Sequence, residues 1–203
     1  LQNKILILHY ACTDVNKSPV IITSISIKDY STKQTLSFSF DSYGDEKSLL
    51  SEFVNYMKKQ KDTIIVTWNQ KSSTYGIQHI QSRCKELNVT ENFPINLEQV
   101  TDLDDIYTKY YGRNYVKDPK LRCLAEQNNI TLRGFVDGLE EIRLFHEKEY
   151  KKFENSTNRK VNVIADYLTM SFNNQLKISK NEDKDTKEKS REKSDWKKIG
   201  KVL

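Results

Sequence analysis

The chain has 203 residues, of which 36% are hydrophobic and 10% aromatic, and this composition is ordinary for a domain with one hydrophobic core. It contains no apolar run near 18 residues, so we expect no membrane partner. The formal net charge is +5, but nine Lys or Arg and six acidic residues lie from Lys180 onward, so the total does not indicate a strongly basic nucleic-acid-binding domain.

Three strands are predicted in the first part of the chain. Residues 4–12 form a nearly continuous apolar run, which is typical of a strand buried on both faces. Residues 20–28 and 34–41 alternate apolar and polar side chains, as half-buried strands do. Asp45 then predicts a helix cap, and the apolar residues that follow fall on one helical face: Leu49, Leu50, Phe53, Val54 and Met57. A further strand is predicted at residues 63–68.

The rest of the chain is predicted to be mainly helical. One helix carries apolar residues at helical spacing: Ile77, Ile80, Cys84 and Leu87. Asp118-Pro119 predicts a helix with proline at its first position, running through Ala125, and Asp137-Gly138 precedes another. The closing helix is predicted at about residues 156–177. Three strands followed by alternating helices and strands predict an α/β domain, with a mixed sheet covered by helices on both faces.

We expect one domain over residues 1–178 and a charged linker or tail over residues 179–203. The segment 179–189 mixes charges and has no apolar residue, so it cannot form a core. Beyond it, four apolar residues recur at steps near three: Trp196, Ile199, Val202 and Leu203. This stripe could dock on the domain or on a partner, begin a further domain, or be an unstructured end.

The three cysteines, Cys12, Cys84 and Cys123, lie far apart and form no Cys-x-x-Cys pair. This pattern argues against a disulfide framework and a structural zinc site. The start, Leu1-Gln2-Asn3-Lys4, is not a secretory signal. We therefore expect buried free thiols in a reducing compartment, and an intracellular, cytoplasmic protein.

Several blocks along the chain together resemble one nuclease family. The blocks are the strand ending in His9-Tyr10-Ala11, then Trp68-Asn69 with Tyr75-Gly76, then Thr101-Asp102-Leu103-Asp104-Asp105, Lys120-Leu121-Arg122-Cys123-Leu124-Ala125 and the segment 134–145. In order and spacing they resemble the proofreading-type DEDD 3′-5′ exonucleases, and most of all the bacterial ones related to the proofreading domain of family B polymerases. The resemblance implies an RNase H-like fold, with a mixed five-stranded sheet and helices on both faces.

Three of the family's four metal-binding carboxylates are replaced at the matching positions of this chain. His9 and Ala11 stand where the family has the two acids of its first strand. Gly76, or Ser73 if the loop is shorter, stands at the third acid. Because two-metal phosphodiester cleavage depends on carboxylates that clamp both ions, we predict no catalytic residues, no metal ion and no cofactor.

The last helix allows two registers against the family. The pattern Asn162-x-x-x-Asp166 keeps an acid, whereas the pattern from Thr157 to Val161 loses it. Asp166 points roughly 130° away from the centre of the helix's apolar stripe, which favours an ordinary solvated residue. At most one acid of four therefore remains.

Four side chains beside the altered positions are predicted to bind nucleic acid: Tyr10, Trp68, Asn69 and Tyr75. The resemblance brings them to one cleft, where a ring could stack on an unpaired base for about 1–3 kcal/mol. The alternative is that the rings fill the space left by ions and substrate and belong to the core.

The sequence is compatible with three functions. The first is a catalytically inactive exonuclease-like domain that binds RNA or single-stranded DNA. The second is a scaffold for a protein partner or a homodimer. The third is an active exonuclease using Mg²⁺ or Mn²⁺ at a rearranged site built from Asp14, the acids at 102–105 or Asp166. A basic, aromatic-lined groove would favour nucleic acid, and an exposed apolar face would favour a protein partner.

Overall fold

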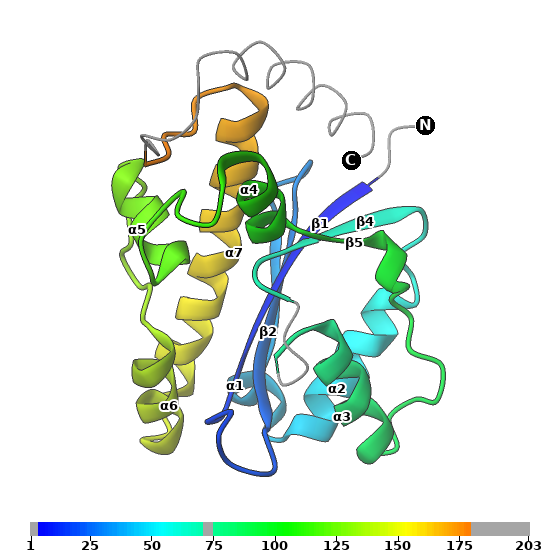
Figure 1. Ribbon diagram of the computed structural model, residues 1–203. Coiled ribbons are helices and arrows are strands. Elements are labelled where there is room, and N and C mark those ends of the chain that lie inside the picture. Colours follow the sequence, from blue (N-terminus) through cyan, green and yellow to red (C-terminus); the bar gives the residue numbers. More distant parts are fainter. Residues whose placement is uncertain (1–3, 71–74, 180–203) are drawn as a thin grey trace.

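A five-stranded mixed sheet with strand order β3-β2-β1-β4-β5 forms the centre of the molecule (Figure 1). The computed structural model describes residues 4–70 and 75–179. The strands are β1 (Lys4–Cys12), β2 (Ile22–Asp29), β3 (Thr35–Ser39), β4 (Thr63–Thr67) and β5 (Val100–Asp102). The central strand β1 runs antiparallel to β2 and parallel to β4. The predicted α/β, RNase H-like architecture is confirmed.

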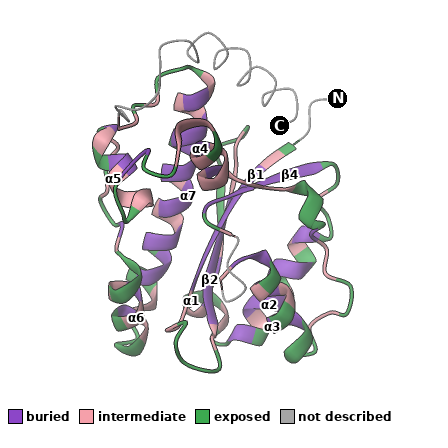
Figure 2. Ribbon diagram, viewed as in Figure 1, coloured by how far each residue is buried: buried purple, intermediate pink, exposed green. Residues whose placement is uncertain are grey.

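Helices cover both faces of this sheet. They are α1 (Phe40–Tyr43), α2 (Glu46–Met57), α3 (Ile77–Glu86), α4 (Leu103–Tyr111), α5 (Lys120–Gln127), α6 (Gly138–His146) and α7 (Tyr150–Phe172), with a 3-10 turn η1 (Leu97–Gln99) before β5. Helices α2 and α3 pack against one face, and α4, α5 and α7 pack against the other. Figure 2 shows the buried residues concentrated on the sheet and on the inner side of α7.

The alternation of side chains along β1 decides which residues face which layer. Leu6, Leu8 and Tyr10 belong to the core beside α2 and α3. Ile7 belongs to the opposite core beside α7, and Ala11 packs with residues of α6 and α7. The two positions that the family resemblance singles out, 9 and 11, therefore lie on the α7 side of the sheet.

Several boundaries differ from the sequence-based expectation. Strand β3 ends at Ser39, two residues early, because Phe40 begins the short helix α1. The C-cap of α1 is Gly44, in a left-handed conformation (φ 78°). Asp45 caps α2 as predicted, since its side chain accepts from the Ser48 N–H. Pro119 is the N-cap of α5 rather than its first residue, with an extended backbone (ψ 117°).

The closing helix α7 begins at Tyr150 and ends at Phe172, whereas residues 156–177 were predicted. It begins earlier because Phe153, which is buried, extends the apolar stripe by a turn. It ends earlier because Asn174 adopts a left-handed conformation (φ 55°) and the Gln175 N–H bonds to the Met170 carbonyl, which closes the last turn.

The cysteines are free, as predicted, although only Cys84 is fully buried and the other two are half-buried. Burial raises the pKa of the Cys12 and Cys84 thiols to about 12. In the described part of the chain, every helix is too short or too polar to cross a membrane.

Candidate functional site

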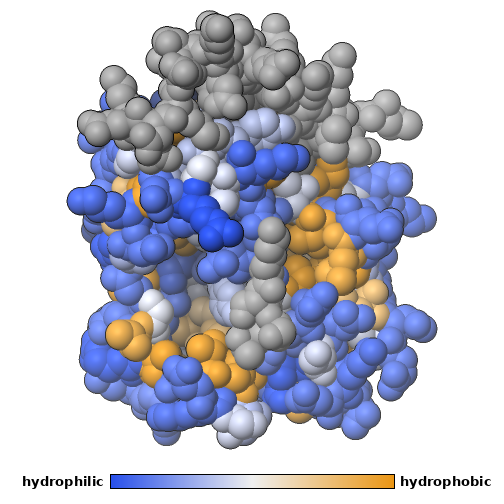
Figure 3. Space-filling model, in the orientation of Figure 1, coloured by the Kyte–Doolittle hydropathy of each residue, from blue (hydrophilic) through white to orange (hydrophobic). Residues whose placement is uncertain are grey.

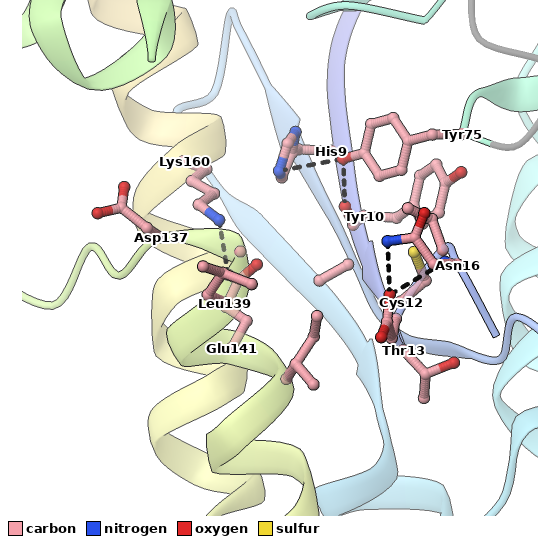
Figure 4. Close-up of a pocket in the computed structure, with 15 residues that line it drawn as sticks. His9, Tyr10, Cys12, Thr13, Asn16, Tyr75, Asp137, Leu139, Glu141 and Lys160 are labelled. Atoms are coloured by element: carbon pink, nitrogen blue, oxygen red, sulfur yellow. Dashed lines mark hydrogen bonds and ion pairs between the residues drawn. The ribbon is translucent and has the colours of Figure 1, made fainter. Parts of the chain in front are cut away.

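A cleft of about 470 Å³ opens at the C-terminal end of β1. Its walls come from the end of β1 and the loop that follows, from Tyr75, from the start of α6 and from Lys160 of α7 (Figure 4). Three lining side chains are carboxylates, Asp14, Asp137 and Glu141, and one is an ammonium, Lys160. Because the cleft joins segments far apart in the sequence, its chemistry depends on how α6 and α7 meet β1.

A buried ion pair stands in this cleft. Lys160 Nζ lies 2.7 Å from Glu141 Oε1, and the two residues are only 6% and 4% exposed. The Ser156 hydroxyl, one turn before Lys160 on α7, donates to the same carboxylate oxygen over 2.7 Å. Charges are tolerated in such a place only when they are paired and hydrogen-bonded, and both conditions hold here.

His9 lies between Lys160 and Tyr75 in the view of Figure 4 and is 6% exposed. Burial, and secondarily the nearby Lys160 charge, hold the pKa of its imidazole well below the usual value of 6.5. Its Nε2 lies 3.5 Å from the Tyr75 hydroxyl, while Nδ1 has no hydrogen-bond partner among the described residues. His9 is therefore neutral at pH 7 and adds no charge to the cleft.

The side chain of Ala11 packs in a small apolar cluster with Leu144 of α6 and Phe153 of α7. Ala11 is 3% exposed and also lines the cleft. An acidic side chain at this position would lie beside this apolar cluster at the wall of the cleft.

Two tyrosines close the cleft on the side of α3. The Tyr75 hydroxyl donates to the Tyr10 carbonyl over 2.7 Å, and the Gly76 N–H donates to the Tyr10 hydroxyl over 2.7 Å. Their rings stack with centroids 4.6 Å apart. Tyr10 is fully buried and Tyr75 is half-buried, so only Tyr75 offers part of a ring surface to a ligand.

The family model described as the exonuclease domain of family B DNA polymerases matches residues 2–140. The chain belongs to this family. The resemblance to DEDD-type 3′-5′ exonucleases is thereby confirmed, with a match that includes β1, β4 and α3 and stops before α7. A comparison with curated proteins finds no match.

Trp68 and Asn69 do not line the cleft, contrary to the expectation from the exonuclease resemblance. Trp68 is 5% exposed and packs in the core, with its ring centroid 5.4 Å from that of Tyr167 and 6.0 Å from that of Tyr107. Asn69 is exposed on the loop after β4, where its backbone N–H donates to Asp102. The alternative that the rings belong to the core holds for Trp68 and for Tyr10.

The acids proposed for a rearranged exonuclease site are dispersed. Asp102 accepts from the N–H groups of Asn69, Gln70 and Asp104, so it fixes the loop after β4 and caps α4. Asp104 accepts from the Lys120 ammonium. Residues 4–70 and 75–179 contain no group of three or more His, Cys, Asp or Glu side chains placed to hold a metal ion.

The last two acids considered for such a site are also separate. Asp14 accepts from the backbone and side chain of Asn16 at the mouth of the cleft, and these bonds lower the pKa of its carboxyl. Asp166 is exposed on α7 and does not line the cleft, which agrees with its interpretation as an ordinary solvated residue.

The family implies two divalent metal ions in this cleft, and the donor set does not fit them. Ala11 and Gly76 have no side-chain donor, and Mg²⁺ and Mn²⁺ prefer oxygen ligands to a single imidazole such as His9. The one buried carboxylate, Glu141, is paired with Lys160, whose positive charge opposes a cation beside it.

The buried ion pair and the hydroxyl that supports it were not predicted from the sequence: Glu141, Lys160 and Ser156. The register from Thr157 to Val161 spans Lys160, but the family pattern assigns no role to that position. One signal was available, since Lys160 lies four positions before Ile164 and eight before Leu168, on the apolar stripe of α7, and a lysine on such a stripe is a candidate for a buried ion pair.

Proposed function

We propose that this domain of the exonuclease family does not cleave nucleic acid and acts as a binding domain. The observation that carries the proposal is the buried Glu141–Lys160 ion pair, which lies in the cleft beside His9 and Ala11. Two-metal cleavage needs carboxylates that hold both ions and neutralise charge that develops on the reacting phosphate. Here the ammonium group neutralises the carboxylate inside the protein.

The lining of the cleft supports a protein partner. Its charged side chains are three carboxylates and Lys160. Lys160 is paired with Glu141, so the lining offers no unpaired cation to a phosphate group. The most exposed large apolar side chain in the described residues, Leu139, lines the same cleft at 85% exposure. Exposed apolar surface rimmed by polar groups is typical of protein interaction sites.

Binding of RNA or single-stranded DNA is the second candidate, and membership of a polymerase exonuclease family is the observation that favours it. In this cleft the candidate depends on Tyr75, because Tyr10 and Trp68 are buried. A base would have to stack on the exposed part of the Tyr75 ring without a cationic side chain free to hold its phosphate.

One titration tests both candidates. Labelled single-stranded RNA and DNA are mixed with the chain in Mg²⁺ or Mn²⁺, with anisotropy as the measure of binding and a gel as the measure of shortening. We expect neither binding nor shortening. Binding without shortening would establish the second candidate, with Tyr75→Ala as the variant that should weaken it. Metal-dependent shortening that is lost in Glu141→Gln would overturn the proposal of inactivity.

A further inference from the structure

The mouth of the cleft carries an apolar rim, which we define as Val15, Leu139 and Ile142. Leu139 is 85% exposed and Val15 43% exposed, and Ile142 is half-buried. All three line the cleft. Only two other large apolar side chains, Leu36 and Leu97, are exposed in the described residues. Figure 3 shows an apolar patch in the lower part of the molecule, where Figure 1 places α6 and α1.

The rim is flanked by acidic groups. Asp14 and Asp137 stand at the mouth, with side chains 25% and 53% exposed. Their cationic neighbours outside the cleft are Lys17, at 3.9 Å from Asp14, and Arg122, at 2.9 Å from Asp137. Lys160 forms an ion pair with Glu141, whereas the Asp14 and Asp137 side chains remain partly exposed beside the apolar rim. The mouth therefore suits a ligand that combines apolar side chains with positive charge.

The chain itself contains a segment of that chemistry outside the described residues. Residues 196–203 combine four apolar residues with three lysines: Trp196, Lys197, Lys198, Ile199, Lys201, Val202 and Leu203, with Gly200 between. The intervening residues 180–195 contain no apolar side chain that would compete for the rim.

Residues 180–195 are numerous enough for residues 196–203 to reach the cleft. Ser179, the last described residue, bonds to the Tyr115 carbonyl and to Gln127, beyond the C-terminal end of α7. The 23 residues of α7 span about 35 Å. The 16 residues from 180 to 195 span up to about 53 Å when extended, which exceeds the length of the helix.

We propose that residues 196–203 dock in this cleft of their own chain, with their apolar side chains on the apolar rim and their lysines toward Asp14 and Asp137. The inference rests on the proposed function, because it takes the cleft to be a protein-binding site. Binding within one chain is favoured by the high effective concentration that a short linker provides.

Trp196 makes the proposal testable in the full chain. The chain has two tryptophans, and the other, Trp68, is 5% exposed in the core. Quenching of tryptophan emission by acrylamide is measured for the 203-residue chain, and the emission of Trp196→Phe is subtracted so that the difference reports on Trp196. Leu139→Asp alters the rim at a highly exposed position, where the fold should tolerate it. Leu97→Asp, 43% exposed just before β5, is the matched control.

We expect Trp196 to be quenched several times less efficiently in the wild-type chain than in Leu139→Asp, with Leu97→Asp behaving as wild type. Efficient quenching of Trp196 emission by acrylamide in the wild-type chain would overturn the proposal. Protection that survives Leu139→Asp would overturn it too, because the segment would then pack elsewhere. Protection that disappears on dilution, together with dimers in sedimentation, would show docking between two copies instead. The nuclease titration gives its answer independently of Trp196, so the two proposals can fail separately.

Discussion

The Glu141–Lys160 ion pair makes a quantitative prediction about stability. At the observed 2.7 Å separation, two unit charges attract each other by about 6 kcal/mol at an effective dielectric constant of about 20. Removing both ions from water costs several kcal/mol for each, which offsets much or all of this attraction. The pair as a whole should therefore contribute little net stability, whereas either partner alone would be a buried charge without compensation.

We expect Lys160→Met and Glu141→Leu each to lower the free energy of unfolding by about 3–5 kcal/mol. The double variant, Glu141→Leu with Lys160→Met, should recover most of this loss, because it replaces two charges by apolar groups of similar size. Ser156 keeps a partner in that variant, since its hydroxyl accepts from the Val136 N–H over 3.1 Å. The two single effects should thus be strongly non-additive.

The assay is urea unfolding at pH 7 of the wild type, both single variants and the double variant, which form a double-mutant cycle. The exposed Glu140–Arg143 pair on α6, with side chains 41% and 52% exposed, is the matched control, and Arg143→Met should change stability little. The reasoning would be refuted if Lys160→Met cost no more than Arg143→Met. Additive single effects would refute it as well, because the two groups would then be separately solvated.

Three further outcomes are expected. In the folded chain the pKa of His9 lies well below 6.5, the value that a histidine has in the unfolded chain. Below about pH 6.5, His9 is therefore protonated more in the unfolded chain than in the folded one. Stability should be fully present above that pH and fall by up to about 1.4 kcal/mol per pH unit as the pH decreases toward the lowered pKa of His9. Urea unfolding at several pH values should show that His9→Gln reduces this slope, and an unchanged slope in His9→Gln would contradict the prediction. Ala11→Glu places a carboxylate at a buried position beside Leu144 and Phe153, so thermal unfolding should show a loss of stability. The His9→Asp/Ala11→Glu variant should not shorten labelled oligonucleotides, and recovered cleavage would show that the third metal-ligand position was misassigned. Trp68→Ala should cost about 3–5 kcal/mol in urea unfolding while leaving any oligonucleotide anisotropy unchanged, and weaker binding in a folded variant would contradict its place in the core.

Local sequence was sufficient for most of the fold. The continuous apolar run at residues 4–12 predicts a strand buried on both faces, and β1 is the central strand of the sheet. Asp45 predicts a cap, and its carboxylate accepts from the third residue after it. These features depend on interactions within a few residues, so periodicity and capping rules are enough to find them. The end of α7 was predicted too late although a local signal was present, because Asn, which adopts the left-handed conformation more readily than most residues, stands at position 174.

The chemistry of the cleft was decided by tertiary structure. The sequence shows that carboxylates are lacking at His9, Ala11 and Gly76, and it thereby predicts the loss of a two-metal site. It does not show that Glu141 of α6 and Lys160 of α7 meet there, because that contact depends on how two helices are placed against β1. Whether the Trp68 ring lies in a cleft or in the core depends likewise on packing against α4 and α7. Periodicity along one chain assigns a residue to a face, but only the packing of distant elements decides which residue it meets there.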